Sequence, residues 1–337
     1  MTSTGRFRRQ FLGIMGAAAL TMTWVAPGLA ADFTMKFSTP TINDLQHEWM
    51  KRYKEELEKR SGGRIEVQLY PASQLGPVNT VLEGMQLGTI EGTINPSEFY
   101  VGVDPRFQVP AVPGLFDSME DARKKLNDPK ARENLLNLGA DKGIIGISLL
   151  VYGPQVIATR KDVKTLADLA GQRLRVLASE TETGTITALG ASAVPMPLNE
   201  VSAALQQGVI DGVSSVLDVF VSLRTNEVAP HLLRTELWYL NTIASVSKAW
   251  LDSLPEDLQK MVIETGKDLE QPMFERQLER DKANRETWAA KGGTSVELQG
   301  ADEEKAQAAA AGVAKAFLDA HPEMKETYDL IKNGGSN

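Results

Sequence analysis

The chain of 337 residues contains no cysteine, which excludes disulfides, iron–sulfur clusters, thiolate zinc sites and cysteine nucleophiles. Its three histidines, His47, His231 and His321, lie too far apart in the sequence to suggest a histidine-based metal site. The formal net charge of −8 argues against a nucleic-acid partner, because nucleic-acid-binding proteins usually present a basic face. A hydrophobic content of 42% with 24% charged residues is ordinary for a globular protein, which argues against a wholly disordered chain.

Sequence signatures of catalysis are missing as well. The chain has no Gly-x-Ser-x-Gly elbow, no His-Glu-x-x-His zinc motif, no phosphate loop ending in Gly-Lys-Ser/Thr, and no Gly-x-Gly-x-x-Gly after a strand. We therefore predict no catalytic residue, no metal and no cofactor. The pattern favours a binding protein over an enzyme.

Residues 1–30 have the composition of an export signal, and the RRQFL sequence of Arg8–Leu12 indicates the twin-arginine type. Three arginines precede an apolar run that is shorter than the ~20 residues of a membrane-spanning helix, and small residues follow at Gly28–Ala31. An ordinary secretory signal is the alternative. Cleavage after residue 30 or 31 removes three arginines, so the exported chain carries a net charge of −11 in place of −8.

The rest of the chain alternates between strand and helix patterns, which predicts an α/β fold with a largely parallel sheet and helices on both faces. A helical tract from Pro255 to Ala290 contains Pro272, which should kink or break it. The expected strands lie at residues 33–37, 65–69, 92–95, 144–152, 156–159, 173–177, 193–195, 212–215, 237–240, 243–246 and 294–298.

The pattern of strands and helices restarts after residue 152 and returns near residue 240, which predicts two lobes joined by strands that cross between them. A cleft between the lobes is the natural place for a ligand. We expect lobe I to comprise residues 31–152 with 241–280, and lobe II to comprise residues 153–240 with 281–334.

Seven sequence blocks occur in the order and at the spacing of one known family: residues 61–76, 88–91, 113–116, 166–176, 189–201, 204–212 and 253–259. The most distinctive are SGGRIEV at Ser61–Val67, LADLAGQRLRV at Leu166–Val176 and ALQQGVIDG at Ala204–Gly212. On these blocks the chain resembles the solute receptors of tripartite ATP-independent periplasmic (TRAP) transporters, the family of C4-dicarboxylate-binding-protein-like receptors.

The resemblance implies a two-lobed periplasmic solute-binding-protein fold with an interlobe ligand cleft and long C-terminal helices. It also implies a receptor that performs no chemistry and delivers a small organic acid to the membrane subunits of a TRAP permease. The family's carboxylate-binding arginine corresponds to Arg175, and an interlobe ion pair is the alternative role for this residue. Arg173 lies two residues earlier on the same strand face, and alternation alone does not settle which arginine faces solvent.

Departures from the family pattern bear on the ligand. Ser215 stands where the family has a ligand-contacting asparagine, and Gly153-Pro154-Gln155 stands where many members have Gly-x-Arg. The loss of an arginine and an amide favours a monocarboxylate with an apolar or aromatic body over a ligand that is clamped at two ends.

The candidate ligand-binding residues are those at strand ends and crossings, where ligands of open α/β sheets bind. They are Arg175, Ser215, Asn95, Ser97, Glu98, Phe99, Tyr152, Gln155, Asp218, Trp238 and Asn241. Core packing is the alternative for Phe99 and Trp238. A periplasmic sensor that presents its closed form to a signalling receptor is the alternative function, and a monomer is favoured over a dimer.

Overall fold

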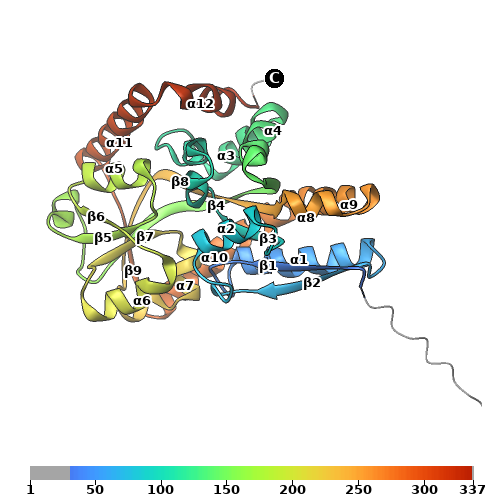
Figure 1. Cartoon of the computed structure of the whole chain (residues 1–337). Coiled ribbons are helices and arrows are strands. Elements are labelled where there is room, and N and C mark those ends of the chain that lie inside the picture. The colour runs from blue at the N-terminus through green and yellow to red at the C-terminus, as the bar shows by residue number, and fades with distance from the viewer. Residues whose placement is uncertain (1–30, 336–337) are drawn as a thin grey trace, which may run out of the picture. The chain divides into compact units, whose positions relative to one another are not determined.

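The computed structural model describes residues 31–335, and the expected export signal lies outside the described residues. A mixed sheet of nine strands forms the centre of this part of the chain (Figure 1). Its strand order is β2-β1-β3-β8-β4-β7-β5-β6, and β9 pairs with β8. The strands are β1 (Phe33–Ser38), β2 (Ile65–Tyr70), β3 (Gly92–Pro96), β4 (Ile144–Thr159), β5 (Arg173–Val176), β6 (Ser192–Pro195), β7 (Gly212–Ser215), β8 (His231–Ser247) and β9 (Thr294–Glu297).

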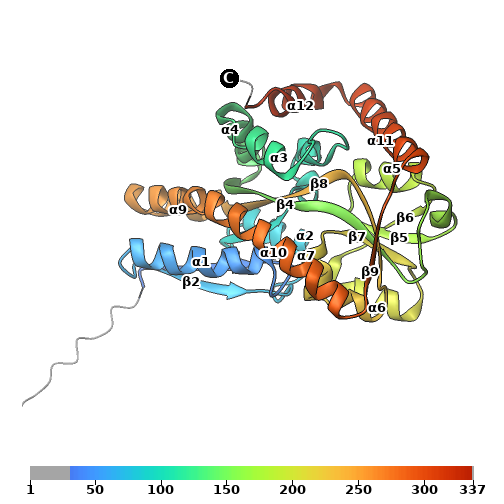
Figure 2. The same cartoon turned by 180° about the vertical axis from the view of Figure 1, so that it is seen from behind.

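Helices cover both faces of this sheet, as Figures 1 and 2 show from opposite sides. They are α1 (Leu45–Arg60), α2 (Val78–Gln86), α3 (Met119–Leu126), α4 (Pro129–Asn137), α5 (Glu180–Ala188), α6 (Leu198–Gln207), α7 (Leu217–Ser222), α8 (Lys248–Ser253), α9 (Glu256–Asp268), α10 (Glu270–Ala290), α11 (Ala301–Ala320) and α12 (Lys325–Lys332). Short 3-10 helices include η1 (Ser97–Gly102) and η2 (Pro105–Ala111). No helix in this described part is both long and apolar enough to span a membrane.

Two long strands, β4 and β8, pair antiparallel and connect two groups of strands. β3 pairs with residues 242–246 of β8, and β7 pairs with residues 156–159 of β4. We refer to the side that carries β1, β2 and β3 as lobe I and the side that carries β5, β6 and β7 as lobe II. Between these two attachments, Val151 pairs with Asn241 and Gly153 with Leu240, so both long strands cross from one lobe to the other at this point.

The sequence analysis divided each long strand in two, and this was wrong. β4 continues through Gly153 and Pro154, which pair with Leu240 and Tyr239 of β8, and the register irregularities lie on either side of them, at Val151/Gly153 and Pro154/Val156. The sheet, expected to be largely parallel, is mixed: five of its strand pairs are parallel and three are antiparallel. The pairs within each lobe that involve β1 or β5 are parallel, but β4 and β8 make the centre of the sheet antiparallel.

The helical tract expected at residues 255–290 breaks close to Pro272, as the sequence predicted. α9 ends and α10 begins at Leu269, three residues before Pro272. Proline costs little in the first turn of a helix, because a residue there has no helical partner for a backbone N–H group. In the middle of a helix, a proline ring would clash with the preceding turn. Figure 2 shows that α10 runs across the back of the sheet, and it contacts both β4 and α7 of lobe II.

Each lobe has its own apolar core. In lobe I, Trp49 and Tyr53 of α1 stack with a centroid distance of 4.7 Å and pack against Phe37 of β1. In lobe II, Leu174 and Val176 of β5 join a separate buried cluster beneath α5 and α11. The C-terminal helices reach both lobes: α11 packs on α5, and α12 packs on α4.

Two glycines in helices provide a matched test of this packing. A Cβ atom on Gly266 of α9 would lie 2.7 Å from the backbone oxygen of Ile147 in β4, whereas a Cβ on Gly312 of α11 would meet nothing within 4 Å. We expect Gly266→Ala to lower the free energy of unfolding by about 1–3 kcal/mol, since the backbone of β4 has to move. Gly312→Ala should raise it by up to about 1 kcal/mol through helix propensity. Urea denaturation of both variants measures the difference, and equal effects would contradict the close contact of α9 with β4.

Candidate functional site

A small cavity lies between the lobes at the point where β4 and β8 cross. Lobe I supplies residues from the ends of β1 and β3 and from α1 and η1. Lobe II supplies residues from the ends of β5 and β7 and from α6 and α7. The crossing strands β4 and β8 supply one residue each. The lining residues are Pro40, Thr41, Gln46, Pro96 and Phe99, then Arg175, Leu177, Leu198, Ser215 and Val219, and finally Tyr152 and Leu240. The carboxyl ends of strands from both lobes therefore meet here, as expected for a ligand site in an open sheet.

The cavity is nearly closed. Its volume for a water-sized sphere is about 20 Å³, which is enough for one or two water molecules and not for an organic acid. Two larger grooves, of about 190 and 340 Å³, lie outside it, and Phe99 and Ala178 line both of them. Phe99 also lines the inner cavity together with Pro40 and Leu198 of the first groove. These three side chains therefore stand between the cavity and the groove.

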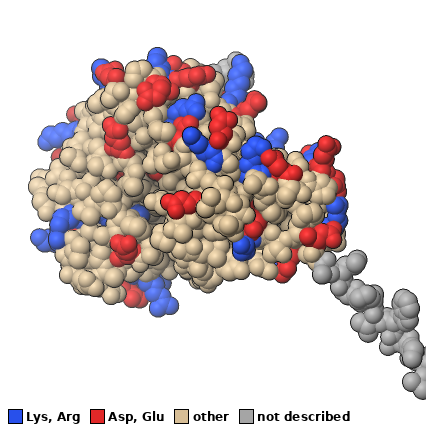
Figure 3. Space-filling model, in the orientation of Figure 1, with Lys and Arg blue, Asp and Glu red and all other residues tan. Residues whose placement is uncertain are grey.

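Figure 3 shows the face of the molecule that Figure 1 presents. Blue and red side chains are interspersed around its rim, and uncharged residues cover most of its middle. Lysine and arginine do not concentrate on one part of this face, so it shows no basic surface that would attract anions from a distance.

Arg175 is the cation of the cavity. It is only 1% exposed, and its Nε–H donates to the backbone oxygen of Met196 (2.9 Å). No protein acceptor for its two terminal nitrogens is found among the described residues, and the side chain lines the cavity. Burial lowers the pKa of Arg175, an effect that nearby Glu182 and Glu98 oppose. The planar end of this guanidinium is therefore free to bind a carboxylate through two parallel hydrogen bonds.

Arg173 has a different environment, which settles the question that strand alternation left open. Its guanidinium pairs with Asp211 at the surface, with Nε at 2.9 Å from Oδ2 and a terminal nitrogen at 3.0 Å from Oδ1. Its side chain is 46% exposed. Arg175, and not Arg173, therefore faces the interior.

Two carboxylates lie close to Arg175, one from each lobe. Glu182 of α5 and Glu98 of η1 are both fully buried. Oε2 of Glu182 accepts from the Leu177 N–H (2.7 Å), and its Oε1 accepts from the Ser214 hydroxyl (2.7 Å). The pKa of Glu182 is raised to about 7 by burial, against the effect of these hydrogen bonds and of Arg175. The pKa of Glu98 is raised further, to about 8, by burial and then by Glu182.

Gln155 and Trp238 support Glu182 from the crossing strands. With its amide nitrogen facing Glu182, Gln155 donates to Oε1 (3.2 Å), and its oxygen accepts from the indole N–H of Trp238 (2.8 Å). Both residues were candidate ligand contacts, and the structure places them behind Glu182. Neither lines the cavity.

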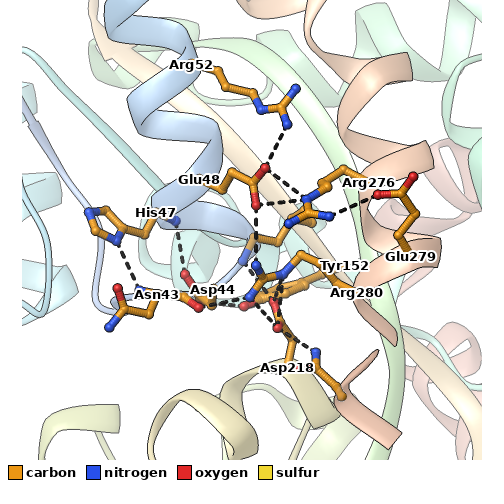
Figure 4. Close-up of polar contacts among 12 residues, drawn as sticks. Asn43, Asp44, His47, Glu48, Arg52, Tyr152, Asp218, Arg276, Glu279 and Arg280 are labelled. Carbon is orange, nitrogen blue, oxygen red and sulfur yellow. Dashed lines mark hydrogen bonds and ion pairs between the residues drawn. The ribbon is translucent and has the colours of Figure 1, made fainter. Parts of the chain in front are cut away.

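Asp218 was also a candidate, and the structure places it in an ion-pair network beside the cavity (Figure 4). Its carboxylate accepts from the Leu45 N–H of α1 (2.8 Å), from a terminal nitrogen of Arg280 (2.7 Å) and from the Asn284 amide (2.7 Å). Arg280 and Asn284 lie on one face of α10, four residues apart. The oxygens of Asp218 are thus occupied by α1 of lobe I and by α10.

The same network continues along α1. Glu48 accepts from Arg276 (3.0 Å) and Arg280 (3.3 Å) of α10, as Figure 4 shows. Tyr152, whose ring lines the cavity, donates its hydroxyl to Asp44, the residue that caps the N-terminus of α1. Burial, followed by the charge of Asp218, raises the pKa of Asp44. The network therefore joins lobe I, the crossing strand β4 and lobe II.

The remaining candidates are buried around the cavity. Asn95 donates to the Thr93 hydroxyl (2.8 Å), and Asn241 donates to the backbone oxygens of Pro110 (3.2 Å) and Tyr239 (3.0 Å). Neither lines the cavity, and Ser97 contacts Glu98. Of the eleven candidates, the cavity brings together four: Arg175, Ser215, Phe99 and Tyr152.

Sequence analysis missed Glu182 and several lining residues. Ser179-x-x-Glu182 has the spacing of a capping box, which would place the glutamate on a solvated helix end. The Ser179 hydroxyl does accept from the Glu182 N–H (3.2 Å), but the carboxylate turns inward to Leu177. Thr41 and Gln46 also lacked a signal, because they come from the loop after β1 and from the first turn of α1. No group of three or more His, Asp or Glu side chains that could hold a metal ion occurs in residues 31–335.

Comparisons with known proteins agree with this arrangement. A family model described as bacterial extracellular solute-binding protein, family 7, matches residues 38–320. A solute-binding protein of Albidiferax ferrireducens is 31% identical over 272 residues, which cover 78% of this chain and 80% of the relative. The solute-binding protein RD1_1052 of Roseobacter denitrificans is 30% identical over 305 residues, which cover 87% of this chain and 91% of the relative.

Solved structures show the same fold. The TRAP periplasmic solute-binding protein RD1_1052, with bound L-galactonate, superposes with a TM-score of 0.81 at 26% identity and covers 89% of this chain and 99% of its own. A TRAP periplasmic solute-binding protein of Desulfovibrio salexigens, with bound orotic acid, also has a TM-score of 0.81 at 26% identity, and covers 89% of this chain and 97% of its own. The chain is thus similar in fold to one protein with bound L-galactonate and to another with bound orotic acid.

Proposed function

The chain belongs to family 7 of the bacterial extracellular solute-binding proteins, the solute receptors of TRAP transporters, and we propose that it binds an acid with a single carboxylate on Arg175. It is a receptor and not an enzyme. One observation carries the proposal: Arg175 is buried at the cavity with its terminal nitrogens unused by the described protein. A planar guanidinium matches one carboxylate in a two-pronged contact, and this cavity offers no second arginine.

The walls favour a ligand with an apolar or aromatic body. Seven of the lining residues have apolar side chains, namely Pro40, Pro96, Phe99, Leu177, Leu198, Val219 and Leu240. Burial of apolar ligand surface against them contributes roughly 25 cal/mol per Å². The relative from Desulfovibrio salexigens with bound orotic acid offers a precedent for a planar monocarboxylate in this fold.

A sugar acid is the second candidate, because RD1_1052 binds L-galactonate. The polar part of the wall supports it. Thr41, Gln46 and Ser215 line the cavity, and Oε1 of Gln46 has no hydrogen-bond partner among the described residues. A ligand hydroxyl would satisfy this buried acceptor, which otherwise costs stability.

The receptor acts by opening and closing of its two lobes. Lobe I, residues 31–152 with 241–280, and lobe II, residues 153–240 with 281–334, separate at the crossing of β4 and β8, admit the acid and close on it. Closure of a monomer in the periplasm, after removal of the export signal, would present the loaded form to the membrane subunits of the permease. In the structure the C-terminal segment contacts both lobes, since α11 packs on α5 and α12 packs on α4.

A thermal-shift screen of the exported chain tests this function. We expect orotate or benzoate, or L-galactonate if the second candidate is right, to raise the melting temperature as concentration rises, because a ligand that binds only the folded state stabilises it by mass action. Succinate, with two carboxylates, should have a smaller effect, and the primary amide of each acid should have none. If amides stabilised the chain as well as their acids, the carboxylate would not be what Arg175 selects.

A further inference from the structure

The buried groups around Arg175 include more acid than this single cation balances, although neither Glu98 nor Glu182 lines the cavity itself. Arg175 carries one positive charge, and Glu98 and Glu182 would together carry two negative charges if both were ionised. A bound carboxylate adds a third. An excess of two negative charges in a site with no exposure to water is strongly unfavourable, so one of the protein's acids has to be neutral when the ligand is present.

Glu182 has the environment of a charged group. It accepts hydrogen bonds from the Leu177 N–H, the Ser214 hydroxyl and the Gln155 amide, at 2.7, 2.7 and 3.2 Å. Three donors directed at two oxygens favour the ionised form, so the pKa of Glu182, about 7, stays below that of Glu98, about 8.

Glu98 has the opposite environment. The Ser97 hydroxyl approaches its Oε2 at only 3.4 Å, and its Oε1 has no partner among the described residues although it is buried. No ion pair to Glu98 within 4.0 Å occurs in residues 31–335. An unpaired buried oxygen is the position that a proton would occupy.

Glu98 belongs to lobe I, whereas Arg175 and Glu182 belong to lobe II. Separation of the lobes would therefore move Glu98 away from Glu182 and expose it to water, where a glutamate is ionised at neutral pH. From these placements we propose that Glu98 takes up one proton from the solvent when the lobes close on an acid. The proton adds to Oε1 of the carboxylate, and the receptor thus binds its anion together with a proton.

The other charged groups around η1 do not change this assignment. Glu83 of α2 lines the outer groove that Glu98 also lines, and it is exposed. From η2, Arg106 is paired with Asp104 at 2.7 Å. β8 contacts η1 through Ile243 and Ser245, whose oxygens are the partners of the Tyr100 hydroxyl. β3 precedes η1 and contributes the neutral Asn95.

The direction of the pH dependence follows from the two states. The pKa of Glu98 is about 8 in the closed form, and an exposed glutamate has its ordinary pKa of 4.5. Protonation of Glu98 favours the closed form fully below the lower value, and this contribution is lost as the pH rises from the lower value to the higher one. The dissociation constant of an acid should thus increase with pH between about 5 and 8, by at most about tenfold per unit.

The inference rests on the proposed function, and its first test compares melting temperatures with a saturating acid present. Glu98→Gln keeps the shape of the side chain and cannot titrate. With saturating orotate or L-galactonate, melting temperatures of the exported wild-type chain and of this variant should diverge from pH 5 to 8.5, with the variant gaining by several degrees at the higher pH. Glu83→Gln is the matched control and should follow the wild type. A difference between wild type and Glu98→Gln that stays constant over this range overturns the inference.

The second test counts the proton directly. Calorimetric titration of the wild type with orotate and with L-galactonate, each in two buffers of different ionisation enthalpy at pH 6.5, should show uptake approaching one proton per acid bound. Glu98→Gln should bind with no uptake and with an affinity independent of pH. Binding by the wild type without proton uptake overturns the inference and leaves the proposed function intact. Failure of every acid to bind contradicts the proposed function and, with it, the inference that rests on it.

Discussion

Replacement of Arg175 by alanine should weaken binding of the acid by a factor of about 30 or more. The side chain is buried at the cavity, and its terminal nitrogens are the donors that remain for a carboxylate. Truncation of one partner of a buried, hydrogen-bonded charge pair costs roughly 2–5 kcal/mol, and each 1.4 kcal/mol corresponds to about tenfold in affinity. Calorimetry with the tightest acid from the thermal-shift screen measures this loss.

Two further variants separate the geometry of Arg175 from its charge. Arg175→Lys keeps the positive charge but loses the planar two-pronged donor, so it should also bind poorly. Arg173→Ala removes a guanidinium from the same strand that is paired with Asp211 at the surface, and it should bind nearly as well as the wild type. A folded Arg175→Ala protein with wild-type affinity would remove Arg175 from the site.

Replacement of Arg280 by alanine should lower the free energy of unfolding by about 3 kcal/mol. Arg280 is the cation that binds Asp218, and the side chain of Asp218 is only 1% exposed (Figure 4). Removal of one partner leaves the other charge buried without compensation, which typically costs 3–5 kcal/mol, and the 16% exposure of Arg280 places the estimate at the lower end of this range. Urea denaturation of the exported chain measures the loss.

The matched control is an ion pair on the neighbouring helix α9. Lys260 and Glu264 lie 3.7 Å apart, with side chains that are 71% and 53% exposed. Lys260→Ala should change stability by less than about 0.5 kcal/mol, since exposed pairs of this kind contribute little. Equal effects of Arg280→Ala and Lys260→Ala would show that the network of Figure 4 does not hold the lobes and α10 together.

The parts of this fold that sequence could predict are those set by local patterns. Alternation and helical spacing located most strands and helices, and Pro272 predicted the break that occurs at Leu269. The continuity of β4 could not be predicted in this way. Gly153-Pro154 normally ends a strand, and only the irregular register with β8, nearly ninety residues later in the chain, keeps these residues within the sheet.

Local sequence patterns were also insufficient to identify the residues of the candidate site. The resemblance to a known family selected Arg175, but strand alternation could not distinguish it from Arg173, because the partner that holds Arg173 at the surface is Asp211, 38 residues away. Asp218 follows a strand, where a polar residue is expected to contact a ligand. Its carboxylate instead pairs with Arg280, 62 residues later in the chain. Long-range pairs of this kind decide which polar residues remain free for a ligand.

The measurement that tests the account most directly is a crystal structure of the exported chain with the acid that the screen identifies. We expect the carboxylate between the lobes, with its two oxygens about 2.7–2.9 Å from the terminal nitrogens of Arg175, and the body of the acid against Phe99 and Leu198. An acid bound with its carboxylate on another group, or outside the cavity between the lobes, would contradict the account.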